Sequence, residues 1–518
     1  MSSGACPPRA PRPYARGVAA WGARVVRVPA AMAGLAAIGV FLWTAVRRVG
    51  YPYGLEWLEG NSLVEVGRLL AGRPLYSAPT IDYVPDGYPP LYFVVAAGPA
   101  GLLGMSYLPL RLVSLLATLS CFALLTRLVQ RETGDLAAGV AAAGLYAATY
   151  FATGTWFDLA RVDSLFLAFS LAGLYAARWM RRPRGAVAAG LLLAAAFLTK
   201  QNALAEAAAI IAVLLFGAAR RLALITAGTF VLLVGLTTLL WGAASRGWYV
   251  FYVFRLLGEH PFEHAAWAGF WIWYLFPVMG VALGAALLAA GRVSPVLAVG
   301  CLALVVEGYA GLLHAGGAAN NMLPVFAVVA LLAGVAMGGA PTGWRGAMAG
   351  VLVLAQIVFL AATTFAPGRT VPTAADRRVG DGLLAWLRGF GGPVAVFSDP
   401  GLAVIAGLPA VAHRGAVYDI VRGTSRTAQA SLARDVDRAV AERRFAAIVV
   451  EQPVDLEGFP SGLARAYRRC PGTLLAGVPR QLFRPVAGPR VRPSALWLPV
   501  DRGSCAAAFD RLARDIRS

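Results

Sequence analysis

Charged residues are scarce in this chain, and that scarcity excludes most soluble folds. Only 14% of the 518 residues are charged, whereas 58% are hydrophobic and the mean hydropathy is +0.65. These values are typical of a protein that crosses a membrane several times. The formal net charge of +20 comes from arginines that gather in short breaks between apolar runs, where the positive-inside rule and anionic lipid account for them. Nucleic-acid binding is not expected, because no motif of that class accompanies the charge.

Cysteine is also rare, and the chain lacks the motifs of several enzyme classes. A glycine-rich phosphate loop, a nucleophile elbow, an internal repeat and a zinc-binding pattern are all missing. Of the five cysteines, Cys121 and Cys301 fall inside apolar runs, which predicts buried, inert side chains. Cys470 and Cys505 could pair in an oxidising compartment, but their spacing alone leaves the bridge open.

Apolar runs of about 20 residues predict a polytopic α-helical membrane protein with about 11 transmembrane helices. Residues 1–28 carry five arginines and no acid, and the first run has no A-x-A type cleavage site, so we expect a cytoplasmic basic tail followed by a retained helix. The predicted spans are about 29–46, 108–129, 136–152, 164–177, a pair that flanks Lys200, 222–244, and four more that end near Arg292, His314, Arg345 and Thr364. Basic residues follow the even-numbered spans, as this orientation requires. The membrane part would then cover residues 29–365.

The first extracytoplasmic loop, residues 47–106, is strongly acidic. Its acids are Glu56, Glu59, Glu65, Asp82 and Asp86. Helical periodicity from Leu55 to Ala71 would place Glu56 and Glu59 on one face, so that both carboxylates could converge on one cavity. A carboxylate partly withdrawn from water has a raised pKa and can accept a proton from an attacking hydroxyl, although a solvated interfacial helix explains the same spacing. A second short helix, Leu91 to Met105, is expected to dip into the outer leaflet.

A second polar cluster lies on the same side of the membrane, between predicted spans three and four. It contains Asp158, Arg161 and Asp163. Asp163 stands directly before an apolar run, where helix capping also explains it. The cluster therefore predicts either a site or a helix start, and the two roles are compatible.

Three charges interrupt otherwise apolar segments. Lys200 is predicted at the outer end of a helical hairpin, where a buried cation is costly unless paired, and a lipid phosphate is a natural partner. Snorkelling of Lys200 to the interface is the alternative. Glu206 and Glu307 are predicted intramembrane acids, which a hydrogen bond between helices would also explain.

The loop after span seven carries Glu259, His260, Glu263 and His264, with a spacing of four residues within each like pair. Such spacing could ligate a metal on a helix, but Pro261 breaks the helix and no HExxH motif is present. The sequence thus neither requires nor excludes a divalent cation as a cofactor, and no metal ligands are assigned.

Residues 366–518 differ in composition from the rest and predict a small soluble extracytoplasmic α/β domain. Short β-like runs occur at Val394 to Phe397, Ala446 to Glu451 and Gln481 to Pro485, and an amphipathic helix is expected from Ala428 to Arg443.

Taken together, these features resemble the membrane-embedded C-type glycosyltransferases, especially the family-39-like group of protein O-mannosyltransferases and aminoarabinose lipid A transferases. The motifs that carry the likeness are the acidic loop ending in PPL, the V-D-S-L at Asp163, the L-T-K at Lys200, the G-E-H at residues 258–260 and the stretch NNMLPVFAVVALLAG. The motifs occur in the family's order and are predicted on one side of the membrane, and the resemblance extends over residues 29–365.

The resemblance implies an inverting enzyme that moves a sugar from a polyprenyl-phosphate carrier to a glycan, lipid or protein acceptor at the outer face of the plasma (inner) membrane. By that likeness, Glu56 or Glu59 is the general base, with a slight preference for Glu59 because Gly60 would leave room for substrate. Asp163 matches the second acid of the family, and Lys200 matches the lysine that binds carrier phosphate.

This chain departs from the family pattern before PPL, where Asp86-Gly87-Tyr88 stands in place of a lysine. Arg161 is the expected substitute as a phosphate ligand. The remaining site candidates are Asp158, Glu259 and His260, and the C-terminal domain is expected to bind acceptor or act as a lid.

Two other functions fit the composition. A transporter or lipid flippase would also need buried acids and a phosphate-binding cation, but no internal symmetry is visible and the charged candidates gather at one face. A non-catalytic membrane assembly protein would use the C-terminal domain as its partner surface.

Overall fold

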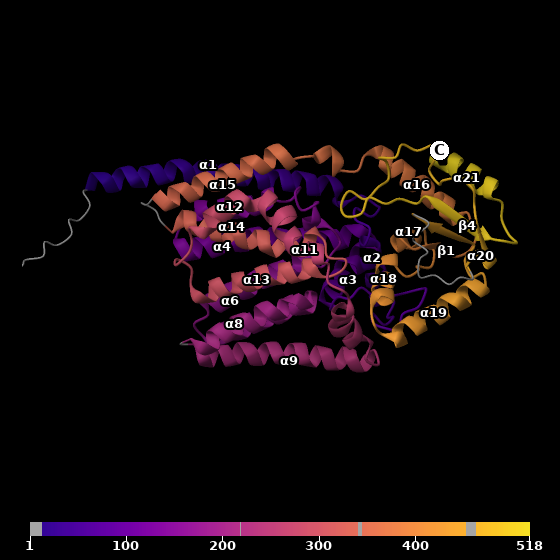
Figure 1. Cartoon of the computed structure of the whole chain (residues 1–518), viewed down its shortest axis with the longest axis horizontal. Coiled ribbons are helices and arrows are strands. Elements are labelled where there is room, and N and C mark those ends of the chain that lie inside the picture. The colour runs from indigo at the N-terminus through magenta and orange to yellow at the C-terminus, as the bar shows by residue number, and fades with distance from the viewer. Residues whose placement is uncertain (1–12, 218, 340–343, 452–462, 518) are drawn as a thin grey trace, which may run out of the picture.

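The computed structural model describes residues 13–217, 219–339, 344–451 and 463–517, and Figure 1 shows a long helical bundle with a small α/β unit at one end. The bundle helices are α1 (Pro13–Val49), α4 (Tyr107–Thr133), α5 (Leu136–Ala148), α6 (Asp163–Trp179), α7 (Pro183–Thr199), α8 (Leu204–Phe216), α9 (Arg220–Ala244), α11 (His264–Gly269), α12 (Phe276–Leu287), α13 (Pro295–Leu313), α14 (Leu323–Gly338) and α15 (Trp344–Thr364). A π-helical segment, Phe270–Leu275, joins α11 to α12.

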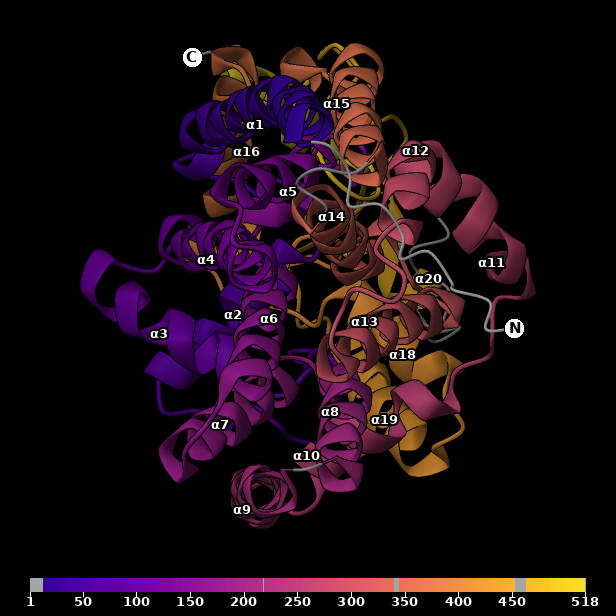
Figure 2. The same ribbon diagram turned by 90° about the vertical axis from the view of Figure 1, so that its left-hand side faces the viewer.

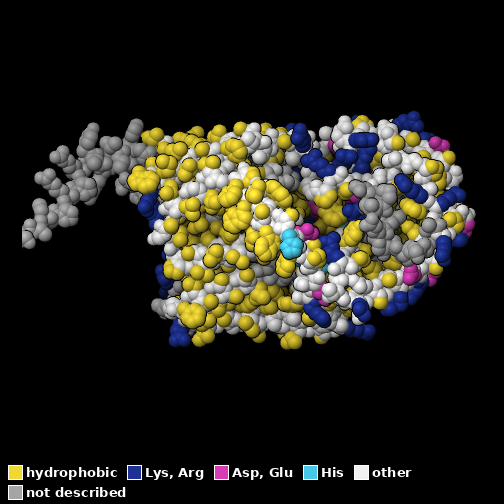
Figure 3. Space-filling model, in the orientation of Figure 1, with side chains coloured by type: hydrophobic (Ala, Val, Ile, Leu, Met, Phe, Trp, Pro, Cys, Tyr) yellow, Lys and Arg dark blue, Asp and Glu magenta, His cyan; other side chains and the backbone are white. Residues whose placement is uncertain are grey.

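Seven helices within the described ranges are long and apolar enough to cross a membrane. Helices also occur at the other predicted positions, but α5, α6, α7 and α8 are shorter, so the count of eleven spans stays a prediction. Large apolar side chains cover the outside of the bundle (Figure 3), for example Leu239 of α9 at 72% exposure. Such a surface needs lipid around it, which makes this a multi-pass membrane protein.

Helix α1 is longer than predicted. It begins at Pro13 and includes residues 13–28, which the sequence places in a tail, while residues 1–12 lie outside the described residues. Helices α1 and α5 pack backbone against backbone, because a Cβ atom on Gly144 would collide with Gly34. Small residues permit such close approach between membrane helices. Viewed from the end of the bundle, the helices surround α14 (Figure 2), which is buried along almost its whole length.

The first loop contributes two helices at the end of the bundle that faces the α/β unit. Helix α3 (Leu91–Leu103) agrees with the prediction, whereas α2 (Glu59–Leu70) begins four residues later than expected. Carboxylates compete for the backbone here: Glu59 accepts the Leu55 N–H and Glu56 accepts the Leu58 N–H. Side chains that take up local amide groups favour turns over helix, so Glu56 lies outside the helix and the two glutamates do not share a helical face.

The chain between α9 and α11 is irregular. It contains α10 (Trp248–Val250), a π-helical turn at Phe251–Arg255 and a 3-10 turn at Leu257–Glu259. Other 3-10 turns are Trp156–Asp158, Gln201–Ala203, Ala319–Met322 and Pro367–Arg369. Two of these turns lie next to the candidate site. The turn at Gln201–Ala203 follows Lys200, and the turn at Ala319–Met322 contains Asn320 and Asn321.

The C-terminal unit combines a four-stranded sheet with helices. Its elements are α16 (Ala374–Arg388), β1 (Val394–Val396), α17 (Pro400–Ile405), α18 (Arg414–Arg422), α19 (Arg426–Ala441), β2 (Ala447–Val450), α20 (Leu463–Ala466), β3 (Tyr467–Arg469), β4 (Ala495–Pro499) and α21 (Cys505–Arg517). The strand order is β1-β2-β4-β3, in which β1 and β2 are parallel and the other pairs antiparallel.

The predicted strand at Gln481 to Pro485 is wrong. Arg492 gathers this segment into a loop, because its guanidinium donates to the carbonyl oxygens of Leu475, Val478, Pro479 and Leu482. A chain folded around one side chain cannot extend into a sheet. The predicted strands near Val394 and Ala446 correspond to β1 and β2, and the predicted helix corresponds to α19.

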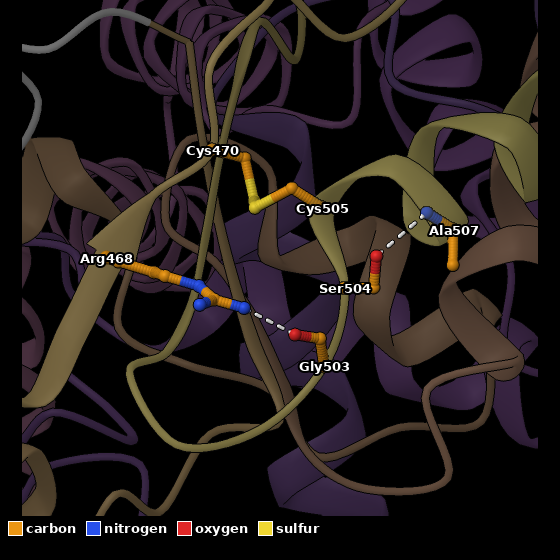
Figure 4. Close-up of a disulfide and its surroundings, with 6 residues drawn as sticks. All are labelled: Arg468, Cys470, Gly503, Ser504, Cys505 and Ala507. Carbon is orange, nitrogen blue, oxygen red and sulfur yellow. Dashed lines mark hydrogen bonds between the residues drawn. A yellow bond between two sulfur atoms is a disulfide. The ribbon is translucent and has the colours of Figure 1, made fainter.

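Cys470 and Cys505 form a disulfide that ties the end of β3 to the start of α21 (Figure 4). Cys121 and Cys301 are free and buried, as the sequence predicts. Because the bridge joins two segments of the C-terminal unit, it stabilises that unit itself.

The C-terminal unit is docked on the first loop. Val486 and Ala487 donate their N–H groups to the Leu55 carbonyl at 2.8 and 3.0 Å, and Ala412 donates to the carbonyl of Ile81 at 2.7 Å. His413 adds a buried contact, with Nε2 3.1 Å from the Trp57 carbonyl. The start of α1 and the C-terminal unit therefore lie at opposite ends of the bundle (Figure 1).

Candidate active site

The polar candidates from the sequence converge at the end of the bundle that the C-terminal unit covers. They come from the first loop, the α5–α6 connection, the α7–α8 connection and the start of α14. These segments are separated by up to about 260 residues along the chain, so only the fold brings them together.

Glu59 is enclosed in a buried ion pair. Arg111 of α4 holds it with two bonds, Nη2 to Oε2 at 2.7 Å and Nε to Oε1 at 3.0 Å, and both residues are fully buried. The backbone N–H groups of Leu55 and Ala160 donate to the same carboxylate. Burial would raise the pKa of Glu59, but Arg111 and these donors lower it overall. Its ion pair with Arg111 makes Glu59 an anchor between the loop and α4.

Gly60 does not leave room for a substrate. A Cβ atom there would collide with Asp399 and Gly401 at the start of α17. The missing side chain instead lets the C-terminal unit approach the first loop closely. The reason for preferring Glu59 over Glu56 therefore does not hold.

Glu56 has a different environment. Its Oε2 accepts the Leu58 N–H at 3.0 Å, while its buried Oε1 has no hydrogen-bond partner among the described atoms. Burial raises the pKa of Glu56 to about 8, and nearby Arg161 opposes part of that rise. A carboxyl group with a pKa near neutrality and an unused oxygen is suited to accept a proton.

Arg161 is a buried cation with unused donors. Its guanidinium lies 5.6 Å from the ring centre of Tyr88 and 5.7 Å from that of Trp156, and Nη2 donates to the Tyr88 hydroxyl at 3.3 Å. Nε and Nη1 have no partner within the described chain. A planar guanidinium with two free N–H groups can bind one phosphate through both.

Lys200 neither snorkels nor stands alone. Its Nζ donates to Asp163 Oδ1 at 3.0 Å and to Asn321 Oδ1 at 3.1 Å, and only 5% of the residue is exposed. Asn320 also donates to Asp163 Oδ1, at 2.9 Å. Asp163 is the first residue of α6 and Val162 its N-cap, so the expected capping bond is absent from this helix start. The Asp163 side chain instead forms an ion pair with Lys200.

Several site residues were not identified as such from the sequence. Asn320 and Asn321 belong to the NNMLP stretch, where two polar amides directly before an apolar run could have indicated a role in the site. Asp86 accepts from Asn61 at 2.7 Å, and Glu65 accepts the Asp86 N–H at 2.7 Å. Burial raises the pKa of both acids.

The other candidates hold the structure together. Asp158 accepts from Arg48 Nε at 2.8 Å and from the Tyr150 hydroxyl at 2.9 Å, all in the interior. Glu259 accepts the N–H groups of Thr424 and Ser425 at 2.9 and 3.0 Å.

His260 Nε2 lies 2.9 Å from the Asp419 carbonyl oxygen, so the loop after α9 contacts the C-terminal unit. Within the described ranges, no group of three or more His, Cys, Asp or Glu side chains is placed to hold a metal ion. Glu206 of α8 and Glu307 of α13 are buried carboxyls in the bundle, with oxygens that lack a hydrogen-bond partner among the described atoms.

A pocket opens next to Glu56, between the first loop and the C-terminal unit. Its walls include Tyr53, Glu56 and Trp57 from the loop, and Ser398, Asp399, Glu451, Phe483 and Arg484 from the C-terminal unit. Glu56 therefore interacts electrostatically with Arg161 and also lines this pocket.

Comparison with known proteins agrees with the resemblance seen in the sequence. Residues 87–241 match the sequence profile of the family described as dolichyl-phosphate-mannose-protein mannosyltransferase, which confirms the predicted likeness to membrane-embedded glycosyltransferases over that range. No match was found among curated protein sequences.

Solved structures extend the likeness to the whole fold. ArnT from Cupriavidus metallidurans bound to undecaprenyl phosphate superposes with a TM-score of 0.56 at 15% identity, over 92% of this chain and 98% of ArnT. The same enzyme in the apo state gives a TM-score of 0.52 at 13% identity, over 90% and 97% of the two chains. At these identities, the match establishes a shared fold.

Proposed function

We propose that this membrane protein is an inverting glycosyltransferase that takes a sugar from a polyprenyl-phosphate carrier and places it on an acceptor hydroxyl. The family profile supports sugar transfer from a lipid phosphate, and the fold shared with ArnT supports undecaprenyl phosphate as the kind of carrier. A lipid-borne donor reaches the site from the bilayer, and phosphate is already a competent leaving group.

One observation carries the proposal. Glu56, a buried carboxyl with an unused oxygen, lies beside Arg161, a buried guanidinium with two unused N–H groups, at the end of the bundle where Lys200 is held by Asp163. A base next to a cationic phosphate site is the arrangement that transfer from a phosphate carrier requires.

The mechanism follows from these positions. Arg161 and Lys200 bind the donor phosphate and stabilise the negative charge that grows on it as the bond to the sugar breaks. Glu56 removes the proton from the acceptor hydroxyl, whose oxygen forms the new bond to the anomeric carbon on the opposite side. Asp163 keeps Lys200 in place, and Glu59 holds the loop that carries the base. Asp163, the second acid of the site, is thus assigned a positioning role.

Lys200 is the only lysine in the chain; every other basic residue of the 46 is arginine. A compact ammonium with three donors can contact Asp163, Asn321 and a phosphate together, which a planar guanidinium cannot do in the same space. We therefore expect Lys200→Arg to retain the charge and still lower kcat/KM by about 10-fold. Transfer kinetics at saturating acceptor measure this, and equal kinetics would remove Lys200 from the phosphate site.

We further propose eleven spans, a cytoplasmic N-terminal tail and an extracytoplasmic C-terminal domain in the plasma membrane. The opposite positions of α1's start and the C-terminal unit support an odd number of crossings (Figure 1). The disulfide Cys470–Cys505 supports an oxidising compartment for the C-terminal domain.

The experiment is transfer by the protein in nanodiscs, from labelled polyprenyl-phosphate sugars to glycan, lipid and protein acceptors. Hexosyl and pentosyl donors belong in the same panel, because nothing in the site selects between them. Release of polyprenyl phosphate with label on an acceptor supports the proposal. Donor movement across liposome membranes without any product would favour a flippase, and neither activity across the panel would favour an assembly protein.

A further inference from the structure

A basic loop of the C-terminal domain lies directly over the candidate base. This segment, residues 479–493, is called the basic strap here. Its Val486 and Ala487 donate to the Leu55 carbonyl, one residue from Glu56, and Phe483 donates its N–H to Asp376 at 2.7 Å. A Cβ atom on Gly488 would lie 3.0 Å from Glu56 Oε1, so a side chain at this position would crowd the base.

The strap carries positive charge only. It contains four arginines and no acidic residue. Arg492 is used internally to fold the loop, whereas Arg480, Arg484 and Arg490 are exposed and show no hydrogen bond or ion pair within the described chain. Basic side chains are also seen gathering where the bundle meets the C-terminal domain (Figure 3). Unpaired surface arginines at one rim attract anions.

The pocket beneath the strap is suited to hydroxyl groups. Arg484 stands at its rim, Tyr53 and Phe483 supply aromatic faces, and Asp399 and Glu451 supply carboxyl groups. Burial raises the pKa of Asp399 to about 7 and that of Glu451 to about 8. Near neutral pH Glu451 is mostly protonated and Asp399 about half protonated, so both can bond hydroxyls and they repel an incoming anion less than two ionised carboxylates would.

We propose that the basic strap and this pocket bind the acceptor, and that the acceptor is an anionic, hydroxyl-bearing glycan. Its acidic groups contact Arg480, Arg484 and Arg490, while one hydroxyl enters the pocket and reaches Glu56. The proposal rests on the proposed function, because it uses Glu56 as the base.

Geometry assigns this side to the acceptor. The phosphate ligands Arg161 and Lys200 lie at the end of the bundle, which a carrier lipid reaches from the membrane. The pocket lies between the first loop and the C-terminal domain, and its lining includes no residue of the bundle helices. A water-soluble glycan chain fits that position, whereas a lipid headgroup would be held at the membrane surface.

The test measures binding, which needs no turnover. Full-length protein in nanodiscs of zwitterionic lipid is titrated with two probes, an oligogalacturonate and a short poly(glycerol phosphate), and with a neutral maltooligosaccharide. At least one anionic probe is expected to bind, with affinity at least 10-fold above the neutral one. The triple variant R480A/R484A/R490A is expected to lose that advantage.

A matched control removes the same charge elsewhere on the domain. Arg426, Arg434 and Arg438 of α19 are exposed and lie away from the pocket, so R426A/R434A/R438A is expected to bind like the wild type. An equal loss in both triple variants would overturn the proposal, because it would show non-specific attraction. So would binding to neither anionic probe, or preferential capture of anionic vesicles through the strap arginines. If binding behaves as expected while no donor is ever turned over, the proposed function fails and the anion site stands.

Discussion

Glu56 and Glu59 show how packing gives two neighbouring carboxyls opposite roles. Glu59 meets Arg111 and two backbone donors in the interior, whereas Glu56 keeps one oxygen free beside Arg161. From the sequence, both are candidates for the base, with a slight preference for Glu59. Arg111 decides between them, and its role could not be foreseen, because it is one arginine within the long apolar run of α4.

Replacing Glu59 should damage stability more than replacing Glu56. Glu59→Gln leaves Arg111 buried without its counter-charge, and breaking a buried pair costs about 3–5 kcal/mol. Glu56→Gln removes a carboxyl that is already largely neutral near pH 7, so its unfolding temperature should stay close to that of the wild type. Thermal unfolding in detergent measures both variants. Equal unfolding temperatures would contradict the anchoring role of Glu59.

The pKa of Glu56 predicts how transfer depends on pH. A general base works in its deprotonated form, and burial raises the pKa of this one to about 8. kcat/KM should therefore rise as the pH increases from 6 and level off above about 8. The profile is measured with saturating donor in buffers of constant ionic strength. A flat profile between pH 6 and 9 would argue against Glu56 as the base.

At the scale of elements, apolar runs predict helices well because lipid leaves the backbone no other partner. The errors occur where side chains replace water or lipid as the partner of the backbone. Glu56 and Glu59 delay the start of α2, and Arg492 turns the predicted strand at Gln481 to Pro485 into the basic strap. Contacts of this kind depend on tertiary structure, so local sequence patterns do not reveal them.

His413 makes the docking of the C-terminal domain sensitive to acid. Its Nε2 lies 3.1 Å from the carbonyl oxygens of Trp57 and Ser398, and its Nδ1 accepts the Gly415 N–H. Burial lowers the pKa of His413 to about 3, against about 6.5 for a free histidine. The undocked state therefore takes up a proton that the docked state excludes, and docking weakens as the pH falls from about 6.5 towards 3, by about 1.4 kcal/mol per unit.

Hydrogen exchange at pH 7 and pH 5 measures this effect. Exchange of amides around Trp57 and in α18 should increase at pH 5, after correction for the intrinsic rate, and His413→Gln should remove most of the difference. His264 is exposed, so His264→Gln serves as the control. If both variants keep the full response, another group controls docking.

At the scale of the whole molecule, the fold builds the site from segments that are distant in sequence. Lys200, Arg161 and Asp163 could be identified as site candidates from their position at the ends of apolar runs, and the structure brings them together with the first loop. Asn320 and Asn321, in the turn before α14, contact Asp163 and Lys200 respectively. A role for the C-terminal domain in acceptor binding or as a lid could be expected from the sequence, but its docking on the first loop could not, since docking depends on shape, for example on the absence of a side chain at Gly60.

This arrangement places the base at the boundary between a membrane part and a soluble part. Arg161 and Lys200 lie at the end of the bundle, Glu56 lies in the first loop, and the basic strap closes over it. The account therefore predicts that donor recognition and proton removal can be separated by single substitutions.

The most direct test is sugar transfer by Glu56→Gln in nanodiscs, together with binding of undecaprenyl phosphate by the same variant. The account predicts that turnover falls by about 10²- to 10⁴-fold while the phosphate lipid still binds, since Arg161 and Lys200 are untouched. Wild-type turnover in Glu56→Gln, with any donor that the wild type uses, would contradict it.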